Sequence, residues 1–223
     1  MTADQALSAE WLDRTDTVEA FYAGARDQYL PGKPMWLTET AEAACGGDKF
    51  AAQFADTFRF VNQLGTLAQR GVQVVMRNTL ASSDYGLVDE HTLKPRPDYW
   101  AAVLWKRTMG SVVLDPGASD DPNLRIYAQC MQGAKGGVTV MALNTDRAKE
   151  QQISLPKSAN RFTLTANDLT SADVKLNGKV MQIGSNGSVP KFAGERVKAG
   201  AVNLPPASIT FFTIPAAGNQ SCE

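Results

Sequence analysis

The distribution of hydrophobic positions divides the sequence near residue 110. Before this point, long segments with helical periodicity alternate with short apolar runs. After it, short segments in which apolar and polar residues alternate are separated by turn residues. These periodicities predict an α/β domain at residues 1–110, followed by an all-β domain at residues 111–223.

Three segments before residue 110 have helical periodicity: 8–29, 49–69 and 96–111. The second has an apolar stripe suited to packing on a sheet, formed by Phe50, Phe54, Phe58 and Val61. In the third, Pro97 suits a first helical turn and Gly110 suits the C-terminal end. The tryptophans of this region, Trp36, Trp100 and Trp105, are expected to be packing residues rather than platforms for a sugar ring.

Two short apolar runs separate the predicted helices: Met35–Leu37 and VQVVMRN at residues 72–78. The second is nearly continuous in apolar content, as strands buried on both faces of a parallel sheet tend to be. Helices and strands therefore alternate as in a βα-repeat architecture. Only two strands are present, whereas a closed (β/α)8 barrel needs eight strands and roughly 250 residues.

The second half predicts an antiparallel β-sandwich, because seven or so strand-like segments with period-2 alternation follow one another at short intervals. The segment LNGK at residues 176–179 contains Asn-Gly between strand-like runs, which is a strong signal for a β-hairpin.

Composition and charge exclude several classes of function. The 223 residues are 43% hydrophobic and 20% charged, with a formal net charge of −1 and no basic block. A nucleic-acid partner is therefore not expected. No run approaches the roughly 20 apolar residues of a membrane-spanning helix. The N-terminus lacks the basic start and apolar centre of a signal peptide.

Three cysteines and one histidine do not fit the usual zinc-ligand spacings, and neither a metal nor a cofactor is expected. A Ser-His-Asp triad would have to use His91. This residue lies in the turn-like segment DEHTLKPRP, which favours an exposed, solvated imidazole.

Polar side chains end both predicted strands of the first region. Glu39 ends the first strand and Asn78 the second. In parallel βα sheets the functional groups lie at the C-terminal ends of strands, so Glu39 is a candidate catalytic carboxylate. The alternative is a carboxylate that caps or salt-bridges the next segment. Glu42 is a weaker candidate, because it falls in the loop.

The segment CGGDKF follows, with Cys45, Gly46 and Gly47 at its start. It lacks the residues of a phosphate loop. Its glycines permit a sharp turn that exposes backbone amides to an anion such as a sugar carboxylate. Cys45 is a candidate nucleophile, although no histidine lies nearby in sequence and a space-filling thiol is favoured.

Taken together, PMWLTETAEAACGG, the VVMR strand, the YGLVDE loop and the PDYW helix start resemble glycoside hydrolase family 79, the heparanases and β-glucuronidases. The resemblance covers nearly the full chain and corresponds to the C-terminal part of that family. It implies the last two βα units of a (β/α)8 barrel followed by a β-sandwich, and a retaining hydrolase of glucuronide-containing glycans.

The resemblance also implies roles for particular residues. Glu39 matches the catalytic nucleophile. Tyr85 and the turn at Cys45, Gly46 and Gly47 match the groups that hold the uronate carboxylate. Asn78 stands where a glutamine is common, which leaves its sugar contact open.

Cys130 and Cys222 correspond to cysteines that the family joins by a disulfide. A disulfide indicates an oxidising compartment, so a secreted or periplasmic location is expected.

The family's acid/base glutamate lies in an Asn-Glu-Pro-like motif, and this chain contains no such motif. The sequence therefore predicts a glycosidase fragment that carries the nucleophile and is inactive alone. Its site would be completed by an N-terminal half. Two origins stay open: a truncated or misannotated gene product, and a protein whose other part is a separate chain. The alternative is a non-catalytic β-sandwich module that binds glycans or has a structural role.

Overall fold

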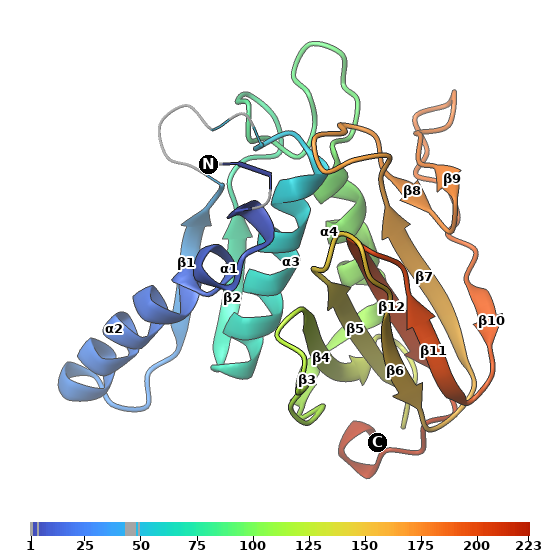
Figure 1. The fold of residues 1–223 in the computed structure, drawn as a ribbon. Helices are drawn as coiled ribbons and strands as arrows, with labels where there is room; N and C mark the ends of the chain where they lie inside the picture. Colours follow the sequence, from blue (N-terminus) through green and yellow to red (C-terminus); the bar gives the residue numbers. More distant parts are fainter. Residues whose placement is uncertain (1, 4, 43–47, 49) are drawn as a thin grey trace.

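The computed structural model describes residues 2–3, 5–42, 48 and 50–223. In the α/β half, the helices and strands are η1 (Gln5–Leu7), α1 (Ala9–Leu12), α2 (Arg14–Tyr29), β1 (Met35–Thr40), α3 (Phe54–Gln69), β2 (Val72–Arg77) and α4 (Pro97–Thr108). β1 and β2 form a parallel two-stranded sheet. Helix α3 lies between this sheet and the large sheet of the β half (Figure 1).

The remaining elements are strands and one short 3-10 helix: β3 (Met109–Leu114), β4 (Leu124–Met131), β5 (Val138–Asn144), β6 (Gln151–Leu155), β7 (Ala159–Thr165), β8 (Lys175–Leu176), β9 (Lys179–Val180), β10 (Glu195–Val197), β11 (Gly200–Leu204), β12 (Ser208–Ile214) and η2 (Gln220–Cys222). Eight strands form one sheet in the order β3-β4-β5-β12-β7-β8-β9, with β10 also paired to β7. Strands β11 and β6 form a separate antiparallel pair. The predicted antiparallel pairing after residue 110 is confirmed, whereas the division into two domains stays a prediction.

The principal core is shared by the helices and the large sheet. Phe54 and Phe58 of α3 pack in it with Trp100 of α4, and Phe211 of β12 lies in the same cluster. The predicted apolar stripe of α3 is therefore buried. The core that it enters contains residues of the antiparallel sheet as well as of the helices. Trp100 is confirmed as a packing residue, since only 2% of it is exposed.

Strand β12 is buried along its whole length because both faces of the sheet are covered. Ile209 and Phe211 belong to the core beneath the helices. Phe212 and Ile214 belong to a second core, which includes residues of β6 and β11. Alternate residues thus enter two different cores, and this explains why the strand carries large apolar residues on both faces.

The Asn-Gly hairpin is confirmed: β8 and β9 pair across Asn177 and Gly178, whose φ angles are 47° and 78°. Positive φ at both central residues is the geometry of a type I′ turn.

Several expectations for the α/β half were wrong in detail. The segment 8–29 is two helices that meet at Asp13 rather than one. Gly110 does not end α4 but lies in β3, where a Cβ atom would sit 2.5 Å from the Cys130 backbone oxygen. Strand β2 is not buried on both faces, since Val72 is its only buried residue. The physical reason is that, among the described residues, β2 pairs only with β1.

Candidate active site

The end of the parallel sheet brings Glu39 and Asn78 together. β1 and β2 pair as far as Thr40 and Arg77, with shifts of register between Met35 and Trp36 and between Leu37 and Thr40. The Asn78 backbone N–H donates to the Thr40 carbonyl at 2.8 Å. The Asn78 side-chain amide then donates to Glu39 Oε1 at 2.7 Å. Two polar residues that are 39 positions apart in sequence thus form one exposed carboxylate–amide pair.

The next residue, Thr40, is linked by hydrogen bonds to the helices that pack beside β1. Thr40 donates its hydroxyl to Gln63 Oε1 on α3 at 2.9 Å, and the Gln63 amide donates to Thr15 Oγ1 on α2 at 3.1 Å. These bonds tie the end of β1 to its neighbouring helices. The preceding residue, Glu39, is exposed.

A buried ionic cluster lies next to this pair. Arg59 forms a two-bond ion pair with Asp56, with N–O distances of 2.5 and 3.0 Å. Arg77 contacts Asp98 at 3.2 Å and Asp56 at 3.5 Å, and it also donates to the backbone carbonyl of Asn78. The cluster joins α3, β2 and α4, so it holds the backbone from which the Asn78 side chain reaches Glu39.

Burial raises the pKa of one carboxyl group in the cluster and of one beside it. Burial, together with the neighbouring Asp56 charge, raises the pKa of Asp98 to about 8, against the opposing effect of Arg77 and Arg59. Burial and the charges of Asp56 and Asp48 raise the pKa of Glu42 to about 7. Both shifts follow from the cost of placing a charged carboxylate out of contact with water beside another carboxylate.

Glu42 was expected to lie in the loop after the strand, and it does, but it is buried rather than solvent-exposed. Only 8% of the residue is exposed, and within the described residues its Oε2 has no hydrogen-bond partner. Apart from Asp48, the charged groups that shift its pKa are Asp56, Arg59 and Arg77 of the buried cluster, and Glu39 is not among them.

The loop that carries Tyr85 is held by an arginine that the sequence analysis did not single out. Arg96 donates to the carbonyls of Ser83 and Gly86 at 2.9 and 3.2 Å, and it pairs with Asp89 at 3.2 Å. Tyr85 is half-buried, and no hydrogen bond in the described part of the chain joins it to Glu39. The predicted turn at Cys45, Gly46 and Gly47 lies outside the described residues.

Asp89 organises the far end of the same loop. Its side chain accepts hydrogen bonds from the backbone N–H groups of Thr92 and His91 at 2.8 and 3.1 Å, and from the Thr92 hydroxyl. These bonds to the ionised form hold the pKa of Asp89 well below its usual range. His91 is exposed, as predicted.

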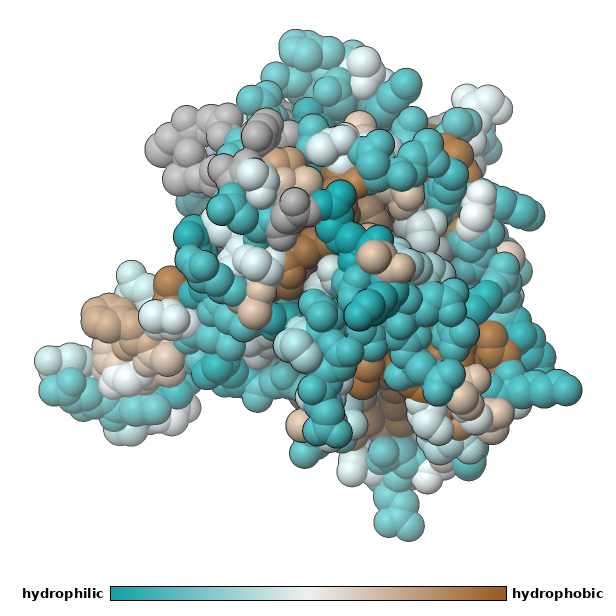
Figure 2. All heavy atoms as spheres, viewed as in Figure 1, coloured by the Kyte–Doolittle hydropathy of each residue, from teal (hydrophilic) through white to brown (hydrophobic). Residues whose placement is uncertain are grey.

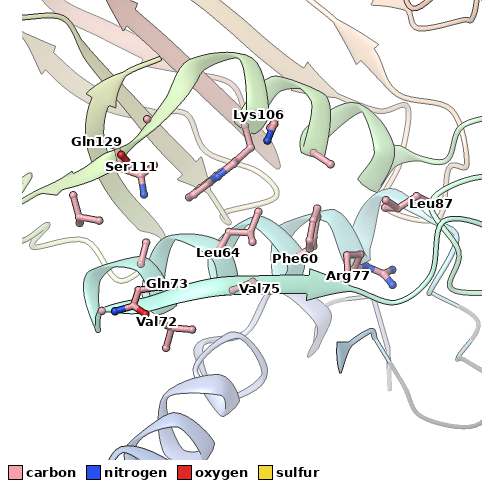
Figure 3. Close-up of a pocket in the computed structure, with 16 residues that line it drawn as sticks. Phe60, Leu64, Val72, Gln73, Val75, Arg77, Leu87, Lys106, Ser111 and Gln129 are labelled. Atoms are coloured by element: carbon pink, nitrogen blue, oxygen red, sulfur yellow. The ribbon is translucent and has the colours of Figure 1, made fainter. Parts of the chain in front are cut away.

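Two grooves flank the two-stranded sheet. A groove of about 590 Å³ runs along β1 between α2 and α3, and Glu39, Glu42 and Trp36 are among the residues that line it. A second groove of about 570 Å³ runs along β2 between α3 and α4 (Figure 3). Trp36 was expected to be a packing residue, but it is 55% exposed and lies in the first groove.

Cys130 and Cys222 form a disulfide, which closes a loop across 92 positions of sequence. The predicted pairing is confirmed. The described residues contain no cluster of histidine, cysteine or carboxylate side chains suited to a metal ion. None of the helices in this part of the chain is long and apolar enough to cross a membrane.

Among solved structures, the fold is similar to that of glycosidases. A 4-O-α-L-rhamnosyl-β-D-glucuronidase from Fusarium oxysporum aligns with a TM-score of 0.71 and 13% sequence identity, covering 96% of this chain and 50% of that one. At this identity the likeness concerns the fold alone. The chain therefore has the fold of part of a glycoside hydrolase.

Sequence relatives show which glycoside hydrolases this chain resembles. Heparanase from Gallus gallus is 32% identical over 99% of this chain and 45% of its own length, and baicalin-β-D-glucuronidase from Scutellaria baicalensis is 31% identical over 95% and 42%. Inactive heparanase-2 from Homo sapiens is 28% identical over 87% and 37%. No protein-family model matches the chain.

The chain is thus a heparanase- and glucuronidase-like glycoside hydrolase sequence. It spans less than half the length of these curated relatives.

Proposed function

We propose that this chain supplies the nucleophile side of a retaining β-glucuronidase site. The observation that carries the proposal is the 2.7 Å hydrogen bond from the Asn78 amide to Glu39 Oε1. This bond orients an exposed carboxylate at the end of a parallel strand, the position where βα enzymes place catalytic groups. Among its relatives, the baicalin-β-D-glucuronidase supports a glucuronide as the substrate.

In this proposal, Asn78 holds Oε1 of Glu39, and Oε2 attacks the anomeric carbon. The glycosidic C–O bond breaks, a glycosyl ester forms on Glu39, and the leaving oxygen takes a proton from a second carboxyl group about 5 to 5.5 Å away. Water activated by that second carboxylate then cleaves the ester. Tyr85 and residues 45–47 bind the uronate carboxylate in this proposal.

The acid that protonates the leaving group belongs, in this proposal, to a polypeptide segment outside this chain. β1 and β2 are the last two strands of a (β/α)8 barrel, and residues 111–223 are its attached β-sandwich. The chain alone is inactive. The disulfide between Cys130 and Cys222 supports an oxidising compartment, hence a secreted or periplasmic protein.

A labelling experiment tests the nucleophile separately from the missing acid. A 2-deoxy-2-fluoro-β-D-glucuronyl fluoride loses fluoride without an acid catalyst and leaves a stable sugar ester on the nucleophile. We expect mass spectrometry of the chain, mixed with a complementary polypeptide, to locate the label on Glu39.

Glu39→Gln should abolish the label, and Glu42→Gln, which changes a nearby buried carboxyl group, should retain it. A label on any other carboxylate, or none in a complex that forms, would refute the role of Glu39.

A second candidate function is a non-catalytic module. The match to inactive heparanase-2 favours it, because this sequence relative is itself named as inactive. It predicts that no mixture hydrolyses an aryl β-glucuronide, and that any glycan binding is unaffected by Glu39→Gln.

A further inference from the structure

Arg96 lies outside the carboxylate–amide pair of Glu39 and Asn78, and it bonds to the loop that carries Tyr85. We propose that Arg96 is a positioning residue that makes the site selective for uronates over neutral hexoses, because it fixes the loop from which Tyr85 contacts the uronate carboxylate. The inference rests on the proposed function. It adds the residue on which uronate selectivity depends and the way in which that residue acts.

The loop is tied at its base to the two residues that follow Asn78. The backbone N–H groups of Leu87 and Val88 donate to the carbonyls of residues 79 and 80 at 2.9 and 2.8 Å. Tyr85 therefore lies in a closed loop that begins and ends beside Asn78. A change in the shape of this loop changes where Tyr85 lies relative to the carboxylate–amide pair.

The loop has almost no hydrophobic core of its own. Of residues 79–96, all of which the structure describes, only Gly86 is buried. Leu80 and Leu93 are 65% and 71% exposed. Figure 2 shows mainly hydrophilic side chains at the top of the molecule, where Figure 1 places the loop between β2 and α4. Apolar burial is too small to fix such a loop, so its shape depends on hydrogen bonds.

Arg96 donates hydrogen bonds to the backbone on both sides of Tyr85. Its Nη1 atom donates to the carbonyls of Ser83 and Gly86 at 2.9 and 3.2 Å. The same atom also donates to the carbonyl of Asp84. Three carbonyls that flank Tyr85 thus converge on one nitrogen atom, so the backbone of the loop is folded around the guanidinium group.

These contacts leave the guanidinium group poorly placed to bind a substrate itself. An arginine near a uronate site would ordinarily be assigned to the uronate carboxylate, because its planar fork matches a carboxylate. The Nη2 atom of Arg96 already contacts the carboxylate of Asp89 at 3.2 Å, and only 12% of the Arg96 side chain is exposed. Arg96 therefore acts on the site through the loop backbone.

Removal of the guanidinium group leaves three backbone carbonyls of the loop without this donor, so the loop loses the contacts that define its shape. The loss affects Tyr85 and the uronate carboxylate that it holds. It does not affect the bond from Asn78 to Glu39, which does not involve Arg96. A glucuronide should therefore lose more than a glucoside, which has a hydroxymethyl group in place of the carboxylate.

Hydrogen exchange on the isolated chain tests the effect on the loop. In Arg96→Met, the amides of Leu87 and Val88 should exchange faster by about tenfold or more, the effect of losing one hydrogen bond to a charged group. The Asn78 amide, which bonds to β1, should be unchanged. Lys94→Met removes a positive charge from an exposed position of the same loop and should leave all these rates unchanged. Unchanged loop exchange in Arg96→Met would overturn the proposal.

Two sugar reagents test the effect on selectivity. In the mixture that labels Glu39, the chain is treated with 2-deoxy-2-fluoro-β-D-glucuronyl fluoride or with the corresponding glucosyl fluoride. Arg96→Met should lower the ratio of the two labelling rates by about tenfold or more, by slowing the glucuronyl reagent alone. Equal slowing of both reagents would indicate a purely structural role and overturn the proposal.

Arg96→Lys keeps the positive charge but offers one nitrogen atom to four acceptors. We expect a ratio of labelling rates between those of the wild type and Arg96→Met. This variant decides the question if Arg96→Met does not fold. A wild-type ratio in Arg96→Lys, or an equal loss in Lys94→Met, would mean that charge rather than loop position sets the selectivity, and would overturn the proposal.

The role of Arg96 and the proposed function fail in different ways. If Glu39 of the wild-type chain takes no label from either reagent, the proposed function fails, and the role of Arg96 fails with it. If Glu39 is labelled and Arg96→Met keeps the wild-type ratio of labelling rates, only the role of Arg96 is refuted.

Discussion

The buried carboxyl group of Asp98 should make the stability of this protein fall as pH rises. It is 3% exposed, and burial beside Asp56 raises its pKa to about 8. An unfolded chain releases the same proton near pH 3.9. Between these values the folded state binds one proton more than the unfolded state. The free energy of unfolding therefore falls by about 1.4 kcal/mol for each pH unit.

The substitution Asp98→Asn removes this dependence. An amide is a neutral isostere of the protonated carboxyl, and its oxygen can still accept the hydrogen bond from Arg77. Relative to the wild-type chain, the variant should gain about 4 kcal/mol in unfolding free energy between pH 5 and pH 8, as an upper value. In the variant the free energy of unfolding still falls with pH, because the pKa of Glu42 is raised to about 7, but it falls less steeply than in the wild-type chain.

Urea unfolding of the purified chain, followed by fluorescence at intervals from pH 5 to pH 8, measures both curves by linear extrapolation. Asp84→Asn is the matched control, because that carboxylate is exposed, and its curve should run parallel to the wild type. A constant difference between Asp98→Asn and wild type across this range would refute the assignment of the proton to Asp98.

Two further predictions concern stability. Replacing both Cys130 and Cys222 by serine should lower the free energy of unfolding by up to about 4 to 5 kcal/mol, and urea unfolding with and without reductant checks this; equal midpoints would contradict it. Gly65→Ala should destabilise the chain by about 1 to 3 kcal/mol, because the new Cβ would meet the Tyr127 ring at 2.4 Å. Gly24→Ala in α2, where nothing lies within 4 Å, should instead stabilise by up to about 1 kcal/mol, and thermal melts of the pair separate packing from helix propensity.

Local structure could be predicted from the sequence wherever it depends on the residues of a single segment. The Asn-Gly hairpin at Asn177 formed as predicted, because the positive φ angles of a type I′ turn depend on those two residues alone. The buried stripe of α3 follows from periodicity in the same way. The strands end at Thr40 and Arg77, one residue away from the predicted ends at Glu39 and Asn78. The roles of Glu39 and Tyr85 came from a resemblance, and they stay predictions.

The buried ion cluster was not predicted, although the sequence contained a signal for it. Arg77 ends a mainly apolar strand, and Asp98 follows Pro97 at the start of a helix whose next residues are apolar. Charged residues are rarely buried without partners, so each one implies a counter-charge. Which counter-charge it is depends on how α3, β2 and α4 approach one another, and spacing along the chain does not contain that information.

What the sequence by itself determined is the set of elements and the positions of the polar residues at their ends, because periodicity and turn chemistry act over a few neighbouring residues. The tertiary structure decided the contacts between distant segments: the hydrogen bond from Asn78 to Glu39, the shared core of α3 and β12, and the placement of Gly110 against Cys130. It also decided which apolar residues remain exposed. Phe21 and Trp36 have the pattern of core residues, and they lie at the surface because no described segment of this chain covers them.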